Sequence, residues 1–372
     1  MIYLDNSATT YPKPKSVYDA VEEANRNYAF NAGRGSYKKS KESLEIIDIA
    51  RKEIASFIKC DYNRVIFNSS ATEAINTIIN GIEIKENDIV YVTPFEHNAV
   101  IRTLYSKKAN IIIIPFDKES WKLERKKLEN MFAIGKPKAV FVSQISNVTG
   151  YEPEYKTIFE LSKKYKAINV LDAAQGFGII NIITNNVDYV VFDGHKSLYS
   201  IFGVGGFIKL GNDDLKPYIY GGTGSDSLNP NMPNDCPNKY EAGSHNIVAI
   251  YALIEGARWI KKEKIEKKER ELTKYLIQNI SEINKVKLFV PNDKNVCGIV
   301  SISIDGYDSN DFADILDEEY DICVRSGYHC APYVHDFVGS KEYNGTIRIS
   351  VGAFNTKEEI DILISAIKEI LL

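Results

Sequence analysis

Short runs of β-branched and aromatic residues alternate with amphipathic stretches between about residues 65 and 210. The strand-like runs are 64–68, 88–93, 110–116, 139–144, 168–174, 188–193 and 204–210. Apolar residues at helical spacing separate most of these runs, as in TEAINTIING (72–81) and EYKTIFELSKKY (154–165). Strands that are apolar on both faces and separated by helices predict an α/β fold with a mainly parallel central sheet flanked by helices.

The pattern changes in the C-terminal third of the chain. Residues 255–284 carry apolar positions at helical spacing among many charges, which predicts a long helix or a pair of helices with a solvated face. Beyond them we expect strand, strand, helix, strand and a final helix from Thr356. We therefore predict a large α/β domain over 15–255, and a small α+β domain formed by 256–372 with 1–14 beside it.

The composition excludes several classes of function. The 46 basic and 50 acidic residues among 372 give a net charge of −4, which offers no electrostatic case for binding nucleic acid. No apolar run approaches the roughly 18–20 residues of a membrane span. The first ten residues, MIYLDNSATT, show no signal-peptide pattern, so we expect a cytoplasmic protein.

The cysteines favour neither disulfides nor metal binding. There are five of them, an odd number, and none forms a CxxC pair. We expect Cys297 and Cys323, which lie in apolar runs, to be small core residues. Cys330 lies in a Gly-His-Pro segment, RSGYHCAP (325–332), and is predicted to sit in an accessible loop.

Two residues at or just after predicted strands point to one cofactor. Asp172 ends a strand-like run in LDAAQ, and Lys196 follows another in DYVVFDGHKS. A carboxylate can hold the protonated nitrogen of a pyridine ring, and a lysine amine can bind an aldehyde carbon, so the pair predicts pyridoxal 5'-phosphate (PLP). We expect Lys196 to be buried, which disfavours its charged form and suits proton abstraction. Each residue alone has an ordinary alternative, an N-cap aspartate or a surface lysine.

Two candidates could hold other parts of the cofactor. Thr72, in SSATEAIN (69–76), opens a predicted helix whose N–H groups could cradle a phosphate, although a plain N-cap is the alternative. His97 follows a strand, where its ring could stack on the cofactor and shuttle protons. An isolated histidine is more often structural, so this role depends on the neighbouring motifs.

Three further polar residues could contact the cofactor or the substrate. Asn147 could donate to either, or could simply shape a turn before Gly150. Gln175 could bond the phenolic oxygen of the cofactor. Arg348 could grip a carboxylate with two hydrogen bonds, or could form a structural ion pair.

Together these motifs resemble the class V aminotransferase group of PLP fold type I enzymes, specifically cysteine desulfurases and selenocysteine lyases. The resemblance runs from LDNSATTYPKP (4–14) to VGAFNTKEEI (351–360), in the family's order. RSGYHCAP looks like the compact active-site loop of group-II desulfurases. GGTGSDS (221–227) and KYEAGSHN (239–246) look like segments that approach the phosphate from a neighbouring subunit. The resemblance implies a homodimer with sites at the interface.

The resemblance gives each candidate a role. Lys196, Cys330 and His97 would be catalytic, as the cofactor-binding lysine and acid/base, the persulfide cysteine and the stacking imidazole. The cofactor-binding positions are Ala71, Thr72, His97, Asp172, Gln175, His195, Lys196 and, from the partner chain, Ser244. The substrate positions are Asn147, Arg325 and Arg348, and no metal is expected.

The implied reaction converts L-cysteine to L-alanine and leaves a persulfide on Cys330, from which sulfur passes to an acceptor protein. Only a thiolate is competent, so we expect a positive charge near Cys330, from Arg325, His329 or the cofactor. Two alternatives remain open. One is a selenocysteine lyase or another PLP-dependent lyase of β-substituted amino acids, and the other is a degenerate PLP-fold scaffold protein.

Four positions depart from the family pattern. Asp193 stands where Ser or Thr usually contacts the phosphate, and a carboxylate beside a phosphate dianion is repulsive unless it is protonated, turned away or paired. Ser200-Ile201 replaces Gly-Pro, Ser70 replaces Gly, and Tyr37 stands where several group-II enzymes have His. We expect these changes to affect cofactor affinity, efficiency and substrate choice.

Overall fold

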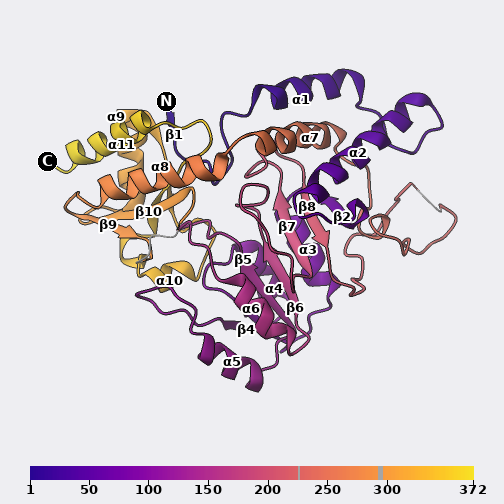
Figure 1. Ribbon diagram of the computed structural model, residues 1–372, viewed down its shortest axis with the longest axis horizontal. Helices are drawn as coiled ribbons and strands as arrows, with labels where there is room; N and C mark the ends of the chain where they lie inside the picture. Colours follow the sequence, from indigo (N-terminus) through magenta and orange to yellow (C-terminus); the bar gives the residue numbers. More distant parts are fainter. Residues whose placement is uncertain (225–226, 292–295) are drawn as a thin grey trace.

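The computed structural model describes residues 1–224, 227–291 and 296–372, and seven strands form its central sheet (Figure 1). The strand order is β2-β8-β7-β6-β5-β3-β4. The strands are β2 (Val65–Asn68), β3 (Ile89–Val92), β4 (Asn110–Ile113), β5 (Ala139–Ser143), β6 (Ile168–Asp172), β7 (Tyr189–Asp193) and β8 (Gly205–Lys209). Neighbouring strands are parallel except at β8, which is antiparallel to both β2 and β7. Each predicted run contains one of these strands, so the mainly parallel sheet is confirmed.

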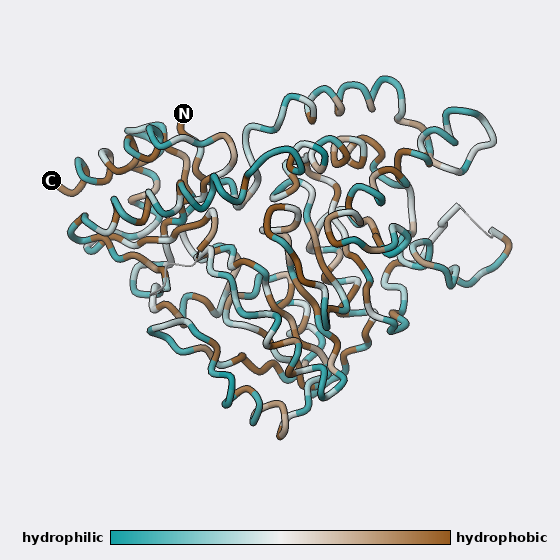
Figure 2. Tube along the Cα trace, in the orientation of Figure 1, coloured by the Kyte–Doolittle hydropathy of each residue, from teal (hydrophilic) through white to brown (hydrophobic). Residues whose placement is uncertain are grey.

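Helices cover both faces of the sheet. One face packs against α3 (Ala71–Gly81) and α4 (Asn98–Ser106). The other packs against α2 (Lys38–Ser56), α5 (Arg125–Ile134), α6 (Tyr155–Lys163) and α7 (Ile247–Lys262), with α1 (Lys15–Asn27) lying on α7. Alternate residues of each strand enter the two cores: Val190 and Phe192 on one side, Val191 on the other. Figure 2 shows hydrophobic residues concentrated in the central strands.

A second sheet is antiparallel and has the order β12-β13-β10-β9. Its strands and helices are β9 (Val286–Phe289), β10 (Ile299–Ile304), β12 (Arg325–Gly327), β13 (Thr346–Ser350), α8 (Ile265–Ile280), α9 (Ser309–Tyr320), α10 (Val334–Val338) and α11 (Lys357–Ile370). The stretch 255–284 forms a pair of helices, the end of α7 and α8, which is one of the two predicted forms. The final helix begins as predicted, with a capping box between Thr356 and Glu359.

The N-terminal segment packs beside this second sheet, as predicted. β1 (Ile2–Tyr3) pairs in parallel with β11 (Ile322–Cys323), and Asp5 forms a bridge with Ser350. Both chain termini lie on the side of the molecule that the smaller sheet and its helices form (Figure 1). The domain boundaries at residues 14 and 255 stay a prediction. Across the described ranges, no helix combines the length and apolar character that crossing a membrane requires.

Cys297 is buried as predicted, whereas Cys323 is only half-buried, because successive residues of a strand face opposite sides and Ile322 takes the buried side of β11. Cys297 packs beside Glu269, a buried acid on α8 whose Oε1 accepts a hydrogen bond from the Tyr199 hydroxyl at 3.4 Å. Burial raises the pKa of Glu269 to about 8. This carboxyl is therefore mostly protonated at neutral pH.

We predict that Glu269 makes the free energy of unfolding fall as the pH rises from about 4.5 to about 8. In this window the unfolded chain has released the proton that the folded chain still binds, and the slope from one such group is up to about 1.4 kcal/mol per pH unit. Glu269→Gln removes the titration and should flatten the profile. Urea unfolding at pH 5, 6.5 and 8 measures the slope, with Glu271→Gln on the exposed side of α8 as control. Equal slopes in wild type and Glu269→Gln would contradict the prediction.

Candidate active site

The carboxyl ends of β2, β3, β5, β6 and β7 lie at one edge of the central sheet, where α/β folds bind ligands. A small, partly open cavity lies at this edge. Most of the predicted site residues line it: Ala71, Thr72, His97, Asn147, Asp172, Gln175 and Lys196, together with Asp193.

Asp172 and Lys196 supply this cavity with an acid and an amine. Asp172 ends β6, and its Oδ1 accepts the N–H of Ala174 at 3.0 Å. Burial raises the pKa of Asp172, while the Ala174 N–H and the charge of Lys196 oppose that shift. Lys196 is only half-buried, so the prediction of a buried lysine was wrong. It stands in the turn after β7 and faces the cavity, because the strand ends at Asp193.

His97 is the N-cap of α4. Its Nδ1 accepts the N–H of Ala99 at 3.0 Å, which leaves the proton of a neutral ring on Nε2. Burial, reinforced by the positive charges of Lys196 and Arg325, lowers the pKa of His97 to about 4. The ring is therefore neutral at neutral pH, and Nε2–H is available as a donor.

Glu96, directly before His97, is a buried residue that the sequence analysis missed. It accepts hydrogen bonds from the Thr93 hydroxyl at 2.6 Å and from the backbone N–H and the hydroxyl of Ser143 at 2.7 and 2.9 Å. These bonds hold the ends of β3 and β5 together beneath the cavity. Burial, with a contribution from the charge of Asp172, raises the pKa of Glu96 to about 7. The available signal was an acid just after a predicted strand, beside a candidate histidine.

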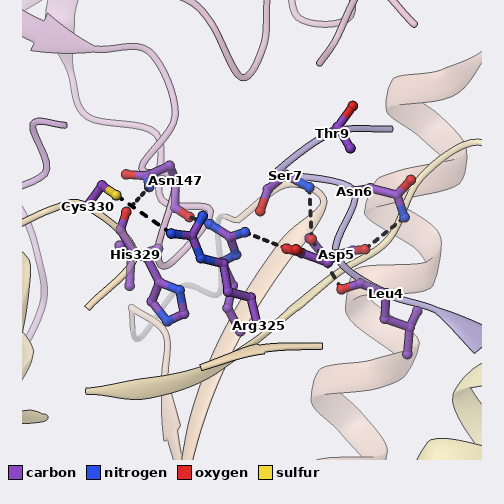
Figure 3. A network of polar contacts seen from close by, with 12 residues as sticks. Leu4, Asp5, Asn6, Ser7, Thr9, Asn147, Arg325, His329 and Cys330 are labelled. Atoms are coloured by element: carbon purple, nitrogen blue, oxygen red, sulfur yellow. Dashed lines mark hydrogen bonds and ion pairs between the residues drawn. The ribbon is translucent and has the colours of Figure 1, made fainter. Parts of the chain in front are cut away.

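The loop that carries Cys330 is fastened to the start of α4. The carbonyl of Cys330 accepts a hydrogen bond from the Asn98 N–H at 2.7 Å. The carbonyl of His329 accepts one from Nδ2 of Asn147 at 2.7 Å (Figure 3). His329 and Cys330 have φ angles of 45° and 57°, which lie in the left-handed backbone region that residues other than glycine rarely adopt. These contacts hold that conformation and leave the Cys330 thiol exposed, as predicted.

Arg325 supplies the positive charge beside this thiol. Nη2 of Arg325 lies 3.6 Å from Sγ of Cys330 (Figure 3). The described residues offer Arg325 no ion pair with a carboxylate, and its cross-strand neighbour is another cation, Arg348. His329 does not contribute charge, because burial lowers its pKa well below the ordinary value and its Nε2 contacts Thr346. A thiolate at Cys330 would therefore pair with Arg325.

Arg348 is almost fully buried, with 1% of its surface exposed. It pairs with Asp5, Nη2 to Oδ1 at 2.5 Å, and donates from Nη1 to the carbonyl of Asn147 at 3.0 Å. This is the structural ion pair that the sequence left open. The role of Arg348 in binding a substrate carboxylate stays a prediction.

The remaining candidates lie outside the cavity lining. The His195 ring stacks on Phe202, with centroids 4.3 Å apart. Ser244 is exposed and lines a different pocket, beside Ser69 and Glu73. Its predicted role belongs to a partner chain and stays a prediction. Within GGTGSDS, residues 225 and 226 lie outside the described residues.

Residues 2–363 match the Aminotransferase class-V family model, and the chain belongs to this family. Two similar curated relatives are each named probable cysteine desulfurase. The protein of Methanothermobacter thermautotrophicus is 31% identical, over 99% of this chain and 94% of its own, and that of Pyrococcus abyssi is 31% identical, over 100% and 94%. The apo structure of a cysteine desulfurase from Thermococcus onnurineus NA1 has a TM-score of 0.88 at 29% identity, covering 99% of this chain and 94% of that one. The predicted family and fold class are confirmed.

We predict that Arg325→Gln slows alkylation of Cys330 by iodoacetamide at pH 7 by about five- to tenfold, because the reacting thiolate loses its paired charge. Timed quenching and mass spectrometry of the Cys330 peptide measure the rate. Arg325→Lys should recover most of it. Cys236 is an internal control, since burial raises the pKa of its thiol to about 11 and it should react slowly in every variant. Equal rates at Cys330 in wild type and Arg325→Gln would refute this role.

Proposed function

We propose that this protein is a PLP-dependent cysteine desulfurase that converts L-cysteine to L-alanine and holds the sulfur as a persulfide on Cys330. The observation that carries the proposal is the exposed Cys330 thiol, 3.6 Å from the Arg325 guanidinium and fastened beside His97. Family membership and the names of the similar relatives support it.

The ring end of the cavity fits PLP. Asp172 would bind the pyridine nitrogen and Lys196 the aldehyde carbon, while Ala71 and Thr72, at the start of α3, would face the phosphate. When bound, PLP supplies an electron sink that makes the Cα proton of an amino acid acidic and weakens its bond from Cβ to sulfur. At the phosphate end the fit is poorer, because Asp193 already accepts the Ala71 N–H.

The protein side chains divide the remaining work. Lys196 would hold the cofactor and, as a free amine, would remove the Cα proton of the substrate. His97 would lie against the cofactor, and its neutral ring would offer Nε2–H as a donor. The Cys330 thiolate attacks the substrate sulfur, the Cβ–S bond breaks, and the sulfur stays on Cys330. The electron pair of that bond stays with the three-carbon remainder, which takes up one proton at Cβ, regains the Cα proton and leaves as alanine.

The proposal includes the assembly that the resemblance implies. Two copies of the chain would form a homodimer in which Ser244 of each copy lies near the phosphate end of the other site. An acceptor protein would then take the sulfur from Cys330. The exposure of both Ser244 and Cys330 is consistent with these two roles.

Alanine released from L-cysteine in the presence of PLP and a thiol reductant tests the proposal. We expect Cys330→Ala to lower this rate at least about 100-fold, since the step that takes the sulfur loses its nucleophile. The variant should still develop the visible absorption of bound PLP. Cys236→Ala, a cysteine outside the site, should retain the wild-type rate.

Three other outcomes would each replace the proposal. Equal alanine release by wild type and Cys330→Ala would indicate a PLP-dependent lyase that needs no persulfide. Alanine from L-selenocysteine but not from L-cysteine would indicate a selenocysteine lyase. A wild-type protein with no visible absorption after addition of PLP would indicate a scaffold.

A further inference from the structure

The positive end of α3 is already occupied by the protein's own acids. The first N–H of the helix, that of Ala71, donates to Oδ2 of Asp193 at 3.3 Å. The N–H of Glu73 donates to the Ser70 hydroxyl at 3.3 Å. The Glu73 carboxylate turns back to accept the N–H and the hydroxyl of Ser69, at 2.8 and 2.5 Å. Two carboxylates thus lie at a helix terminus that attracts anions.

Gly205 brings Asp193 within reach of the helix. Gly205 begins β8 and pairs with Asp193 of β7 on one side and with Asn68 of β2 on the other. A Cβ at this position would lie 2.9 Å from the nitrogen of Ala71. Because Gly205 has no side chain, the start of α3 rests directly on β8, next to the end of β7. The Asp193 carboxylate is 4% exposed and points at the helix from there.

Asp193 is ionised in this position. Burial alone would raise its pKa, but His195, Lys196 and the Ala71 N–H together lower it below the ordinary value. Oδ1 lies 3.5 Å from Nε2 of His195. Lys13, the next nearby cation, gives its hydrogen bonds to the Thr10 hydroxyl and the carbonyl of His195, at 2.7 and 2.9 Å. The negative charge therefore persists at the helix end.

This charge lies where a cofactor phosphate would bind. Asp172 and Lys196 would hold the ring nitrogen and the aldehyde carbon at one part of the cavity, and the start of α3 is an anion-binding part of the lining. A phosphate there would compete with Asp193 for the Ala71 N–H and would be repelled by its charge.

We propose that Asp193 is an internal competitor of the cofactor phosphate, which holds the start of α3 in the cofactor-free protein and weakens the binding of PLP. The inference rests on the proposed function. Asp193 would weaken only the contribution of the phosphate to the affinity for PLP. The contribution of the ring would depend on Asp172 and Lys196. Pyridoxal, which lacks the phosphate, should be insensitive to Asp193.

The test compares the dissociation constants of PLP and of pyridoxal, from visible absorption titrations checked by equilibrium dialysis. We expect Asp193→Ser to tighten PLP binding by about tenfold or more, because it frees the helix N–H and removes the charge. Pyridoxal affinity should change by less than about twofold. Asp193→Asn, which keeps the shape of the side chain, should shift PLP affinity in the same direction by a smaller factor.

Glu73→Gln is the matched control, since it removes one charge from the same helix turn but leaves Asp193 on the Ala71 N–H. Its PLP affinity should stay close to wild type. The inference is overturned if Asp193→Ser binds PLP no more tightly than wild type, if pyridoxal tightens equally, or if Glu73→Gln has the same effect. If no protein in the set binds PLP, the proposed function fails as well. If wild type binds and desulfurates but Asp193→Ser is unchanged, the inference alone fails.

Discussion

Residues 4–9 connect the two sheets, and the geometry of the active site depends on that connection. Asp5 neutralises the buried Arg348 of the smaller sheet, and the carbonyl of Ser7 accepts a hydrogen bond from Nε2 of Gln175, a cavity residue beside the larger one. An unpaired guanidinium at this depth would cost several kcal/mol, so the segment cannot leave while the smaller sheet stays folded. The position of the cysteine loop relative to the cofactor cavity is therefore set in part by the first ten residues of the chain.

Much of the fold could be predicted because its signals are local. Each central strand is apolar on both faces over four or five residues, and the residues that follow strands fall at one edge of a parallel sheet. This is why Asp172 and His97 could be proposed from sequence alone. The prediction that Lys196 is buried was wrong because the turn after β7 presents the amine to the cavity. Four of the elements that were missed, β1, β11, β12 and α10, are two to five residues long, too short for periodicity to show. The longer helices α1 and α2 were not predicted either, because they precede the stretch of alternating strands and helices from which elements were assigned.

The parts that could not be predicted depend on contacts between distant residues. Arg348 meets Asp5 across 343 positions, so its structural and substrate roles were equally plausible from sequence. Asp193 accepts the N–H of Ala71, which lies 122 positions away in the sequence. This hydrogen bond is possible because Gly205, on β8, has no side chain between them. Whether His329 or Arg325 carries the charge beside the thiol was decided by burial, which no local pattern around RSGYHCAP reveals.

The backbone of the cysteine loop limits how sulfur could leave this protein. Its carbonyls at residues 329 and 330 are tied to Asn147 and Asn98, and two consecutive left-handed residues leave little slack for the chain to straighten. With the backbone held in this way, rotation of the Cys330 side chain is the motion left open to a sulfur atom bound there. Under the proposed function, an acceptor would therefore have to bring its own thiol to the exposed Cys330 side chain. Hand-over would then be governed by bimolecular encounter rather than by loop motion.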